Sequence, residues 1–150
     1  MPDTTHHNLL DELIDFSLSR HGAAFADLQL VDRANGLLRL ARTRNLPPVF
    51  RQRLAAVPIY DASAGARAFR SAGPYFVPDI LADRTFAAYH ALASLVGFRA
   101  VSAIPIAIDG QIAGVVCARF AEPRTSPSTA PLDVQAWIKL KQPELRPLLS

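Results

Sequence analysis

Cysteine is almost absent from this sequence of 150 residues, which contains only Cys117. A single cysteine cannot form an internal disulfide, and together with four scattered histidines it gives no metal-ligand spacing. The sequence therefore indicates neither a disulfide framework nor a structural metal. Half of the residues are hydrophobic, which is enough to form a core without such supports.

Long apolar runs are also absent, and the first residues, MPDTTHHNLL, do not have the pattern of a signal peptide. We therefore expect a cytoplasmic protein that does not contact a membrane. Lysine is rare, since all but two of the sixteen basic residues are arginines. The formal net charge of +3 permits an acidic partner without requiring one. Strand parity separates Arg39 from Arg42 and Arg44, so these arginines form no single stripe, and we do not expect nucleic acid as the partner.

The stretch 97–120 predicts a β-hairpin, because two apolar runs flank Asp109 and Gly110 and glycine tolerates the positive φ of a two-residue turn. Ile108 then pairs with Gln111, and the following pairs continue residue by residue. One face of the hairpin would carry Ser102, Ile104, Ile106, Val115, Cys117 and Arg119. The other face would carry Val101, Ala103, Pro105, Ala107, Ile112, Gly114, Val116 and Ala118. We expect a functional site on the first face, because it holds the polar side chains.

The rest of the chain alternates between helical and extended patterns. We expect helices at about residues 4–20, 64–71, 86–95 and 132–141, and a second hairpin at residues 25–43. Pro143 and Pro147 are expected to end the last helix. The long segment 45–99 must lie over one sheet face, where it would form a lid over a small-molecule cavity.

Four segments, taken in order, resemble the GAF domain. They are FADLQLVD (25–32), NGLLRLARTRNLPPVF (35–50), ASAGARAFRSAGPYFVPDILADRTFAAY (62–89) and GFRAVSAIPIAIDGQIAGVVCARFAEP (97–123). The chain is most similar to the GAF modules of bacterial sensor histidine kinases. The resemblance covers about residues 8–140 of a domain that we expect to span residues 1–150.

The resemblance implies an α+β, GAF/PAS-like fold. Its central six-stranded antiparallel sheet would carry the terminal helices on one face and a helical lid on the other. It also implies a homodimer formed through the terminal helices.

Several family features are missing from this sequence. It has no chromophore cysteine in the lid and no NKFDE signature of the cyclic-nucleotide-binding members. It also lacks the several lid cysteines of free methionine-(R)-sulfoxide reductase, and one cysteine cannot form and resolve an internal disulfide. We therefore expect no enzyme, no metal and no covalent chromophore; the ligand itself stays unknown.

The candidate ligand-binding residues line the predicted lid and the polar sheet face. They are Gln29, Tyr60, Ser63, Arg67, Tyr75, Phe86, Tyr89, Ser102, Cys117 and Arg119. Arg119 either binds a ligand anion, extends to water from near the strand end or pairs with an aspartate of the lid. Gln29 either binds the ligand or satisfies a backbone group of the lid. Arg67 either reaches a ligand anion or lies in solvent. The aromatic residues either line a cavity or close the core, and Cys117 is either a small buried hydrophobe or a modification site.

These patterns favour a small-molecule-binding sensory or regulatory protein in bacterial signal transduction that works without catalysis. Ligand binding would shift the lid, and the terminal helices would pass the change to a partner protein. The alternative is a ligand-free scaffold for dimerisation or protein–protein interaction. An enclosed cavity favours the first hypothesis, and solid packing favours the second.

Overall fold

The computed structural model describes residues 4–149 and contains a six-stranded antiparallel sheet with the order β3-β2-β1-β6-β5-β4. The strands are β1 (Phe25–Asp32), β2 (Leu37–Arg44), β3 (Ala56–Pro58), β4 (Tyr75–Val77), β5 (Ala100–Ile108) and β6 (Gln111–Phe120). The helices are α1 (Thr4–His21), α2 (Pro48–Arg53), α3 (Ala64–Ser71), α4 (His90–Val96), α5 (Ala130–Leu140) and α6 (Gln142–Leu149), with 3₁₀ turns η1 (Ile80–Ala82) and η2 (Arg84–Tyr89). None of these helices is long and apolar enough to cross a membrane.

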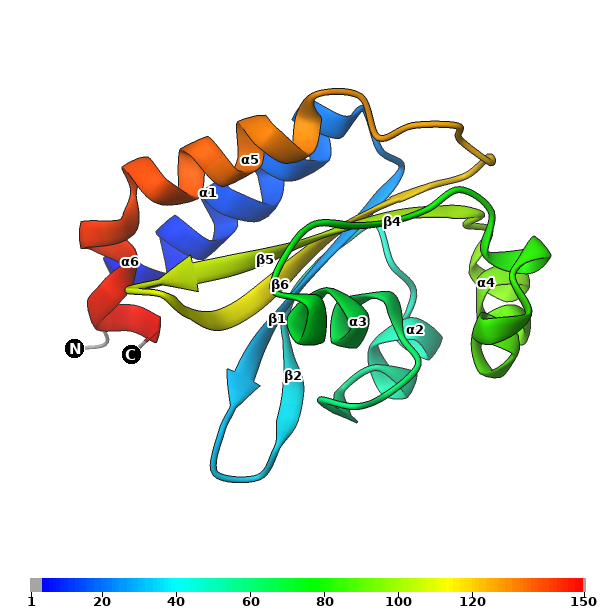
Figure 1. The fold of residues 1–150 in the computed structure, drawn as a ribbon, viewed down its shortest axis with the longest axis horizontal. Coiled ribbons are helices and arrows are strands. Elements are labelled where there is room, and N and C mark those ends of the chain that lie inside the picture. Colours follow the sequence, from blue (N-terminus) through cyan, green and yellow to red (C-terminus); the bar gives the residue numbers. More distant parts are fainter. Residues whose placement is uncertain (1–3, 150) are drawn as a thin grey trace.

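The sheet separates two layers of helices (Figure 1). Helices α1, α5 and α6 cover one face, where Leu13, Ile14 and Leu28 belong to one buried core. The segment 45–99, here called the lid, covers the other face and forms a second core that includes Phe50 and Phe98. This arrangement confirms the expected fold class, with terminal helices on one face and a helical lid on the other.

The predicted turn of the central hairpin is confirmed, because Asp109 and Gly110 adopt φ values of 52° and 79° and Ile108 pairs with Gln111. The predicted register is wrong beyond the first pairs, since Ile106 pairs with Gly114 and leaves one extra residue in β6. A Cβ atom on Gly114 would lie only 2.4 Å from the Gln29 carbonyl oxygen of β1. The bulge therefore forms where a glycine lets two backbones approach closely.

A one-residue shift moves side chains to the opposite face of a sheet, so the bulge divides the predicted polar face. Ser102 lies on the side of the terminal helices, where its hydroxyl contacts His21. Cys117 and Arg119 remain on the lid side, together with Gln29 and Asp27 of β1. The prediction that Ser102 shares a face with Cys117 and Arg119 is therefore wrong.

Side-chain caps hold the lid in place. Ser63 caps α3 by accepting a hydrogen bond from the Ala66 amide, and Asp79 and Asp83 cap η1 and η2. α3 packs on β5 and β6, in the middle of the sheet face. Asp79 also pairs with Arg99, which ties the start of η1 to the end of the lid just before β5. Because α3 packs on β5 and β6, it is the lid element that lies most centrally on the sheet.

The prediction that prolines end the last helix is wrong. α5 ends at Leu140, and α6 begins at Gln142 and extends to Leu149. Pro143 is the second residue of α6, where a proline lacks only an amide that would have no helical partner. Leu145 is buried against the terminal-helix core, and this packing holds α6 in place although Pro147 lies within it.

Candidate functional site

A buried ion pair lies on the sheet face beneath the lid. The Nε of Arg119 donates to Oδ1 of Asp27 at 2.8 Å, and its Nη2 donates to Oδ2 at 3.3 Å. The side chain of Arg119 is 4% exposed, and that of Asp27 is fully buried. Burial is the largest single influence on the pKa of Arg119 and favours the neutral form, but the charge and hydrogen bond of Asp27, together with Cys117 and Tyr89, outweigh it and the pKa of Arg119 is raised. The two-point contact between guanidinium and carboxylate makes the pair mutually neutralising.

Two aromatic rings enclose this guanidinium. Its Cζ lies 4.8 Å from the centre of the Phe50 ring and 4.7 Å from that of Phe98. The two rings contact each other edge to face. Cation–π contacts of this kind are strongest where water is excluded, as it is here. The rings and Asp27 together fix the position of Arg119.

Gln29 projects from β1 on the same face and is 1% exposed. Neither its Oε1 nor its Nε2 has a hydrogen-bond partner among the described residues. Its Oε1 lies against α3, since a Cβ atom on Gly65 would be only 2.2 Å away. Buried side-chain amides are nearly always hydrogen-bonded, so this unpartnered amide is an exception that a ligand could remove.

A small cavity lies next to the ion pair, under the lid. Its walls are formed by Phe50, Leu54, Ser63, Ala64, Ile80, Phe86, Tyr89, Leu92, Phe98 and Arg119. Its volume is about 10 Å³, roughly the space that one water molecule needs. Ala64 lies on the wall, and the next residue, Gly65, contacts Gln29. Access to Gln29 and any larger occupant of this lid cavity therefore require α3 to move.

Tyr89, on the wall of the lid cavity, is hydrogen-bonded to Asp61. The Tyr89 hydroxyl donates to Oδ2 of Asp61 at 2.5 Å, and the same oxygen accepts the Ser63 amide at 2.9 Å. Burial, reinforced by the Asp61 carboxylate, raises the pKa of Tyr89 to about 12. The guanidinium of Arg53 lies 4.5 Å over the Tyr89 ring. Tyr89 thus stays protonated and serves as a hydrogen-bond donor that holds the start of α3.

Arg67 and Tyr75 bind other parts of the lid. The Arg67 guanidinium stacks 3.7 Å over the Phe86 ring and donates to the carbonyl and hydroxyl of Thr85. The hydroxyl of Tyr75 lies 3.5 Å from Nη1 of Arg67. These contacts join α3 to η2. The hypothesis that Arg67 reaches a ligand anion gains no support from this position.

Cys117 is completely buried, and this burial raises the pKa of its thiol. A protonated, inaccessible thiol is a poor nucleophile, so the position suits a small core side chain. Tyr60, by contrast, is 77% exposed and lies outside the lid cavity. The structure thus brings Gln29, Ser63, Phe86, Tyr89, Cys117 and Arg119 together under or at the lid, leaves Arg67 and Tyr75 within the lid, and excludes Tyr60 and Ser102.

Sequence reasoning missed three residues of this site. Asp27 lies near the start of β1, a position that favours exposure, yet it is fully buried and pairs with Arg119. The parity that it shares with Gln29 was the signal that could have placed it under the lid. Phe50 and Asp61 had no comparable signal, because the three-dimensional course of the lid determines their contacts.

Within residues 4–149, no group of three or more His, Cys, Asp or Glu residues could hold a metal ion.

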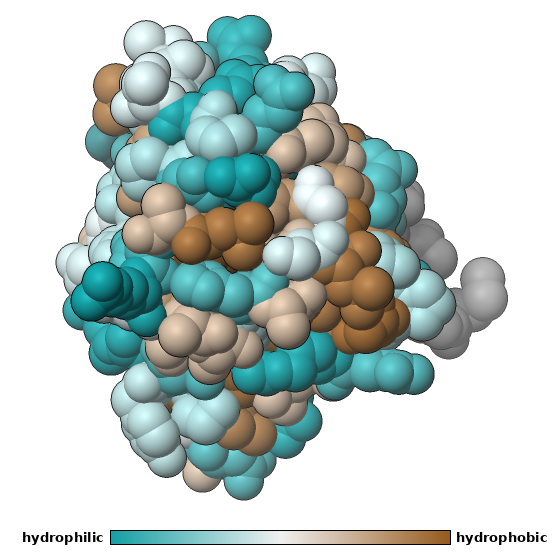
Figure 2. Space-filling view, turned by 90° about the vertical axis from the view of Figure 1, so that its right-hand side faces the viewer, coloured by the Kyte–Doolittle hydropathy of each residue, from teal (hydrophilic) through white to brown (hydrophobic). Residues whose placement is uncertain are grey.

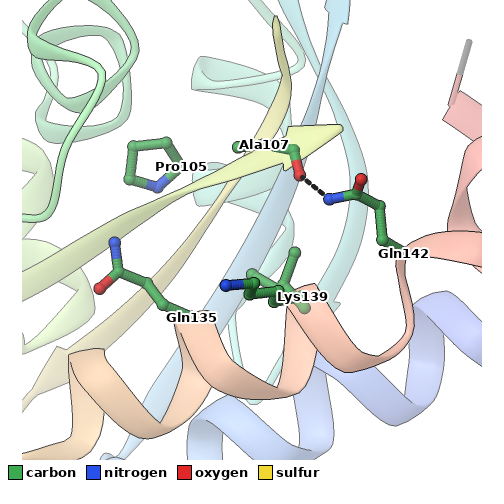
Figure 3. A pocket seen from close by; sticks show the side chains of 6 residues that line it. Pro105, Ala107, Gln135, Lys139 and Gln142 are labelled. Atoms are coloured by element: carbon green, nitrogen blue, oxygen red, sulfur yellow. Dashed lines mark hydrogen bonds between the residues drawn. The ribbon is translucent and has the colours of Figure 1, made fainter. Parts of the chain in front are cut away.

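A larger hollow lies on the surface between α5 and the edge of β5 (Figure 3). There the amide of Gln142 donates to the Ala107 carbonyl and accepts from the Asp109 amide, each at 3.4 Å. A neighbouring strand would make the same pair of bonds, so Gln142 covers an edge that β4 leaves free. We therefore interpret Gln142, which lines this groove, as a residue that protects the sheet edge.

Ser102 and His21 form a separate buried contact on the terminal-helix side. Nε2 of His21 lies 3.0 Å from the Ser102 hydroxyl, and its Nδ1 lies 2.8 Å from the Ser17 carbonyl oxygen. The carbonyl can only accept, so Nδ1 carries the proton and the Ser102 hydroxyl donates to Nε2. The pair borders no cavity under the lid, and it joins α1 to β5.

The free energy of unfolding should fall as the pH decreases through about 6.5. Burial lowers the pKa of His21 below its ordinary value of 6.5, so the unfolded chain binds a proton that the folded chain does not. The slope should reach up to about 1.4 kcal/mol per pH unit and should diminish in His21→Gln. Urea unfolding across a pH series measures it. An unchanged slope in the variant would contradict the assignment.

Comparisons with known proteins agree with this architecture. The family model described as GAF domain matches residues 2–135. The GAF domain region of a Geobacter sulfurreducens PCA protein superposes with a TM-score of 0.75 at 16% identity, over 95% of this chain and 93% of that one. A domain assigned to a two-component sensor histidine kinase of Sinorhizobium meliloti 1021 gives a TM-score of 0.71 at 13% identity, over 93% and 90% of the two chains. A search of curated proteins gave no match.

Several of the similar structures are enzymes. Free methionine-R-sulfoxide reductase from Neisseria meningitidis, solved in complex with its substrate, superposes with a TM-score of 0.66 at 16% identity, over 94% of this chain and 84% of that one. Other free methionine-R-sulfoxide reductases also share the fold. These structures overturn the prediction that the chain is not an enzyme, because the fold gives no reason to exclude catalysis.

Proposed function

Because this chain belongs to the GAF domain family, we propose that it is a cytoplasmic sensory module that binds a small molecule under its lid in bacterial signal transduction. The ligand would occupy an enlarged lid cavity beside Arg119 and Gln29. The lid would then rest in a new position, and the terminal helices would pass the change to a partner protein. Family membership supports the sensory role, and the buried site supports the binding of a ligand.

The unpartnered amide of Gln29 is the observation that carries this proposal. A core that only supports the fold gains nothing from a buried amide without hydrogen bonds, and an apolar side chain would be more stable there. The amide lies beneath Gly65, so it becomes accessible when α3 moves. A ligand that pairs with Gln29 would stabilise the displaced lid, which is the differential affinity that a sensor requires.

Native mass spectrometry of the protein purified from its own host tests the proposal, with Gln29→Met as the variant. Wild-type protein should carry a small molecule that denaturation releases, and the variant should carry none. Gln52→Met, on the exposed side of α2, is the matched control and should retain the molecule. Bare protein in all three samples, together with no binding from a low-molecular-mass host extract, would overturn the proposal.

The tight packing of the lid favours a second candidate function, a scaffold for dimerisation. α5 presents an apolar stripe to the surface, in which Leu132 is 67% exposed and Leu140 is 75% exposed. These residues lie eight positions apart, a spacing that places both within one apolar stripe of a helix. On the face at the α4 end of the molecule, hydrophilic side chains predominate and hydrophobic ones gather toward the right of the view (Figure 2). We propose that the α5 stripe forms a homodimer contact.

Leu132→Glu combined with Leu140→Glu should weaken the homodimer by about tenfold or more, because each change places a charge in an apolar contact. Analytical ultracentrifugation measures the dimer dissociation constant. Leu95→Glu, on α4, replaces a leucine that is 70% exposed and should leave this constant unchanged. A monomeric wild-type protein, or equal effects of the α5 and α4 variants, would contradict the interface.

A further inference from the structure

The chemistry beneath the lid restricts the ligand. We infer that the ligand is an uncharged small molecule that presents a carboxamide or lactam group to Gln29 and a flat apolar body to the phenylalanines that line the adjoining lid cavity. This inference rests on the proposed function, since it describes the occupant of the same site. It depends on the charge balance of the site and on the hydrogen-bonding capacity that remains unused.

The charge balance disfavours an ionic ligand. Asp27 binds Arg119 through both carboxylate oxygens, at 2.8 and 3.3 Å, so the pair contributes no net charge. An anionic ligand would have to displace Asp27, which would leave a fully buried carboxylate without its cation. A cationic ligand would instead meet the guanidinium of Arg119. The earlier hypothesis of an anion held by Arg119 is therefore the less favourable one.

The unused hydrogen-bonding capacity belongs to one amide. Gln29 offers an acceptor at Oε1 and donors at Nε2, and these are the only unpartnered buried polar atoms in the side chains described, residues 9–149. A carboxamide or lactam offers an adjacent donor and acceptor, so it can pair with both atoms at once. A carboxylate can only accept and leaves Oε1 unpaired, and an amidinium can only donate and leaves Nε2 unpaired.

The surrounding walls set the shape of the rest of the ligand. Phe50, Phe86 and Phe98 line the lid cavity, and Phe50 and Phe98 already enclose the planar guanidinium of Arg119. Aromatic walls favour a flat apolar body. Since the cavity now holds only about 10 Å³, such a body enters as α3 moves away from Gln29.

Three isosteric probes test the inference: benzamide, benzoate and benzamidine. They share one ring and differ in the charge and hydrogen-bonding pattern of the substituent. Benzamide should bind at least about tenfold more tightly than the other two, as measured by isothermal titration calorimetry. This preference should disappear in Gln29→Met and persist in Gln52→Met. Equal or tighter binding of either charged probe, or a preference that survives in Gln29→Met, would overturn the inference.

The outcome also separates this inference from the proposed function. If the protein carries a host molecule that is lost in Gln29→Met but prefers a charged probe, the ligand class is wrong and the sensory function stands. If none of the probes binds, the chemistry of the released molecule decides, because a molecule without a carboxamide or lactam overturns the inference. If no host molecule is released and no probe binds, both proposals fail.

Discussion

Arg119→Met should lower the free energy of unfolding by about 3–5 kcal/mol, because it leaves Asp27 buried without its cation. Asp27→Leu should have a similar effect, since it leaves the guanidinium unpaired. The double variant should recover most of the loss, because two apolar side chains can replace a buried ion pair with little change in stability. Equilibrium unfolding in urea measures all three, and it still tests the account if a single variant fails to fold.

The ion pair between Arg146 and Asp109 is the matched control. Its side chains are 46% and 57% exposed, although its Nε–Oδ2 distance is only 2.7 Å. Arg146→Met should therefore change the unfolding free energy by less than about 1 kcal/mol. A comparable effect at both sites, or a double variant as unstable as the single variants, would contradict the interpretation of Asp27 and Arg119 as a mutually neutralised pair.

Gln29→Met should raise the free energy of unfolding of the ligand-free protein by about 1–3 kcal/mol, whereas most core substitutions lower it. The physical reason is that an apolar side chain of similar length removes an amide that is buried without hydrogen bonds. The same change should abolish ligand binding. Urea unfolding provides the measurement, with Gln52→Met as the surface control. A loss of stability in Gln29→Met would mean that the amide is satisfied in the folded state.

Local patterns predicted much of the fold. The pair Asp109-Gly110 fixed the turn of the central hairpin, and the predicted helix at residues 64–71 coincides with α3. The bulge at Gly114 could not be predicted, because it depends on the approach of the β1 backbone to β6. That single extra residue moved Ser102 to the other side of the sheet. Packing of Leu145 likewise outweighed the expectation that the prolines end the helical region.

The candidate site was predicted in part. Gln29 and Arg119 were identified because each is a polar residue within an apolar strand. Asp27 was missed because the sequence does not reveal how far the lid extends over β1. Tyr60 was included because aromatic residues close in sequence were expected to share a cavity, yet it is 77% exposed. The course of a long lid is determined by tertiary contacts, which composition and periodicity do not encode.

Hydrogen–deuterium exchange of the purified protein, with and without a low-molecular-mass extract of its host, tests the central claim most directly. That claim is that a small molecule binds beneath α3 and shifts the lid. The account predicts altered exchange of the amides in α3 and η2 of wild-type protein, and no such change in Gln29→Met. Unaltered exchange in the wild type, or the same alteration in the variant, would contradict it.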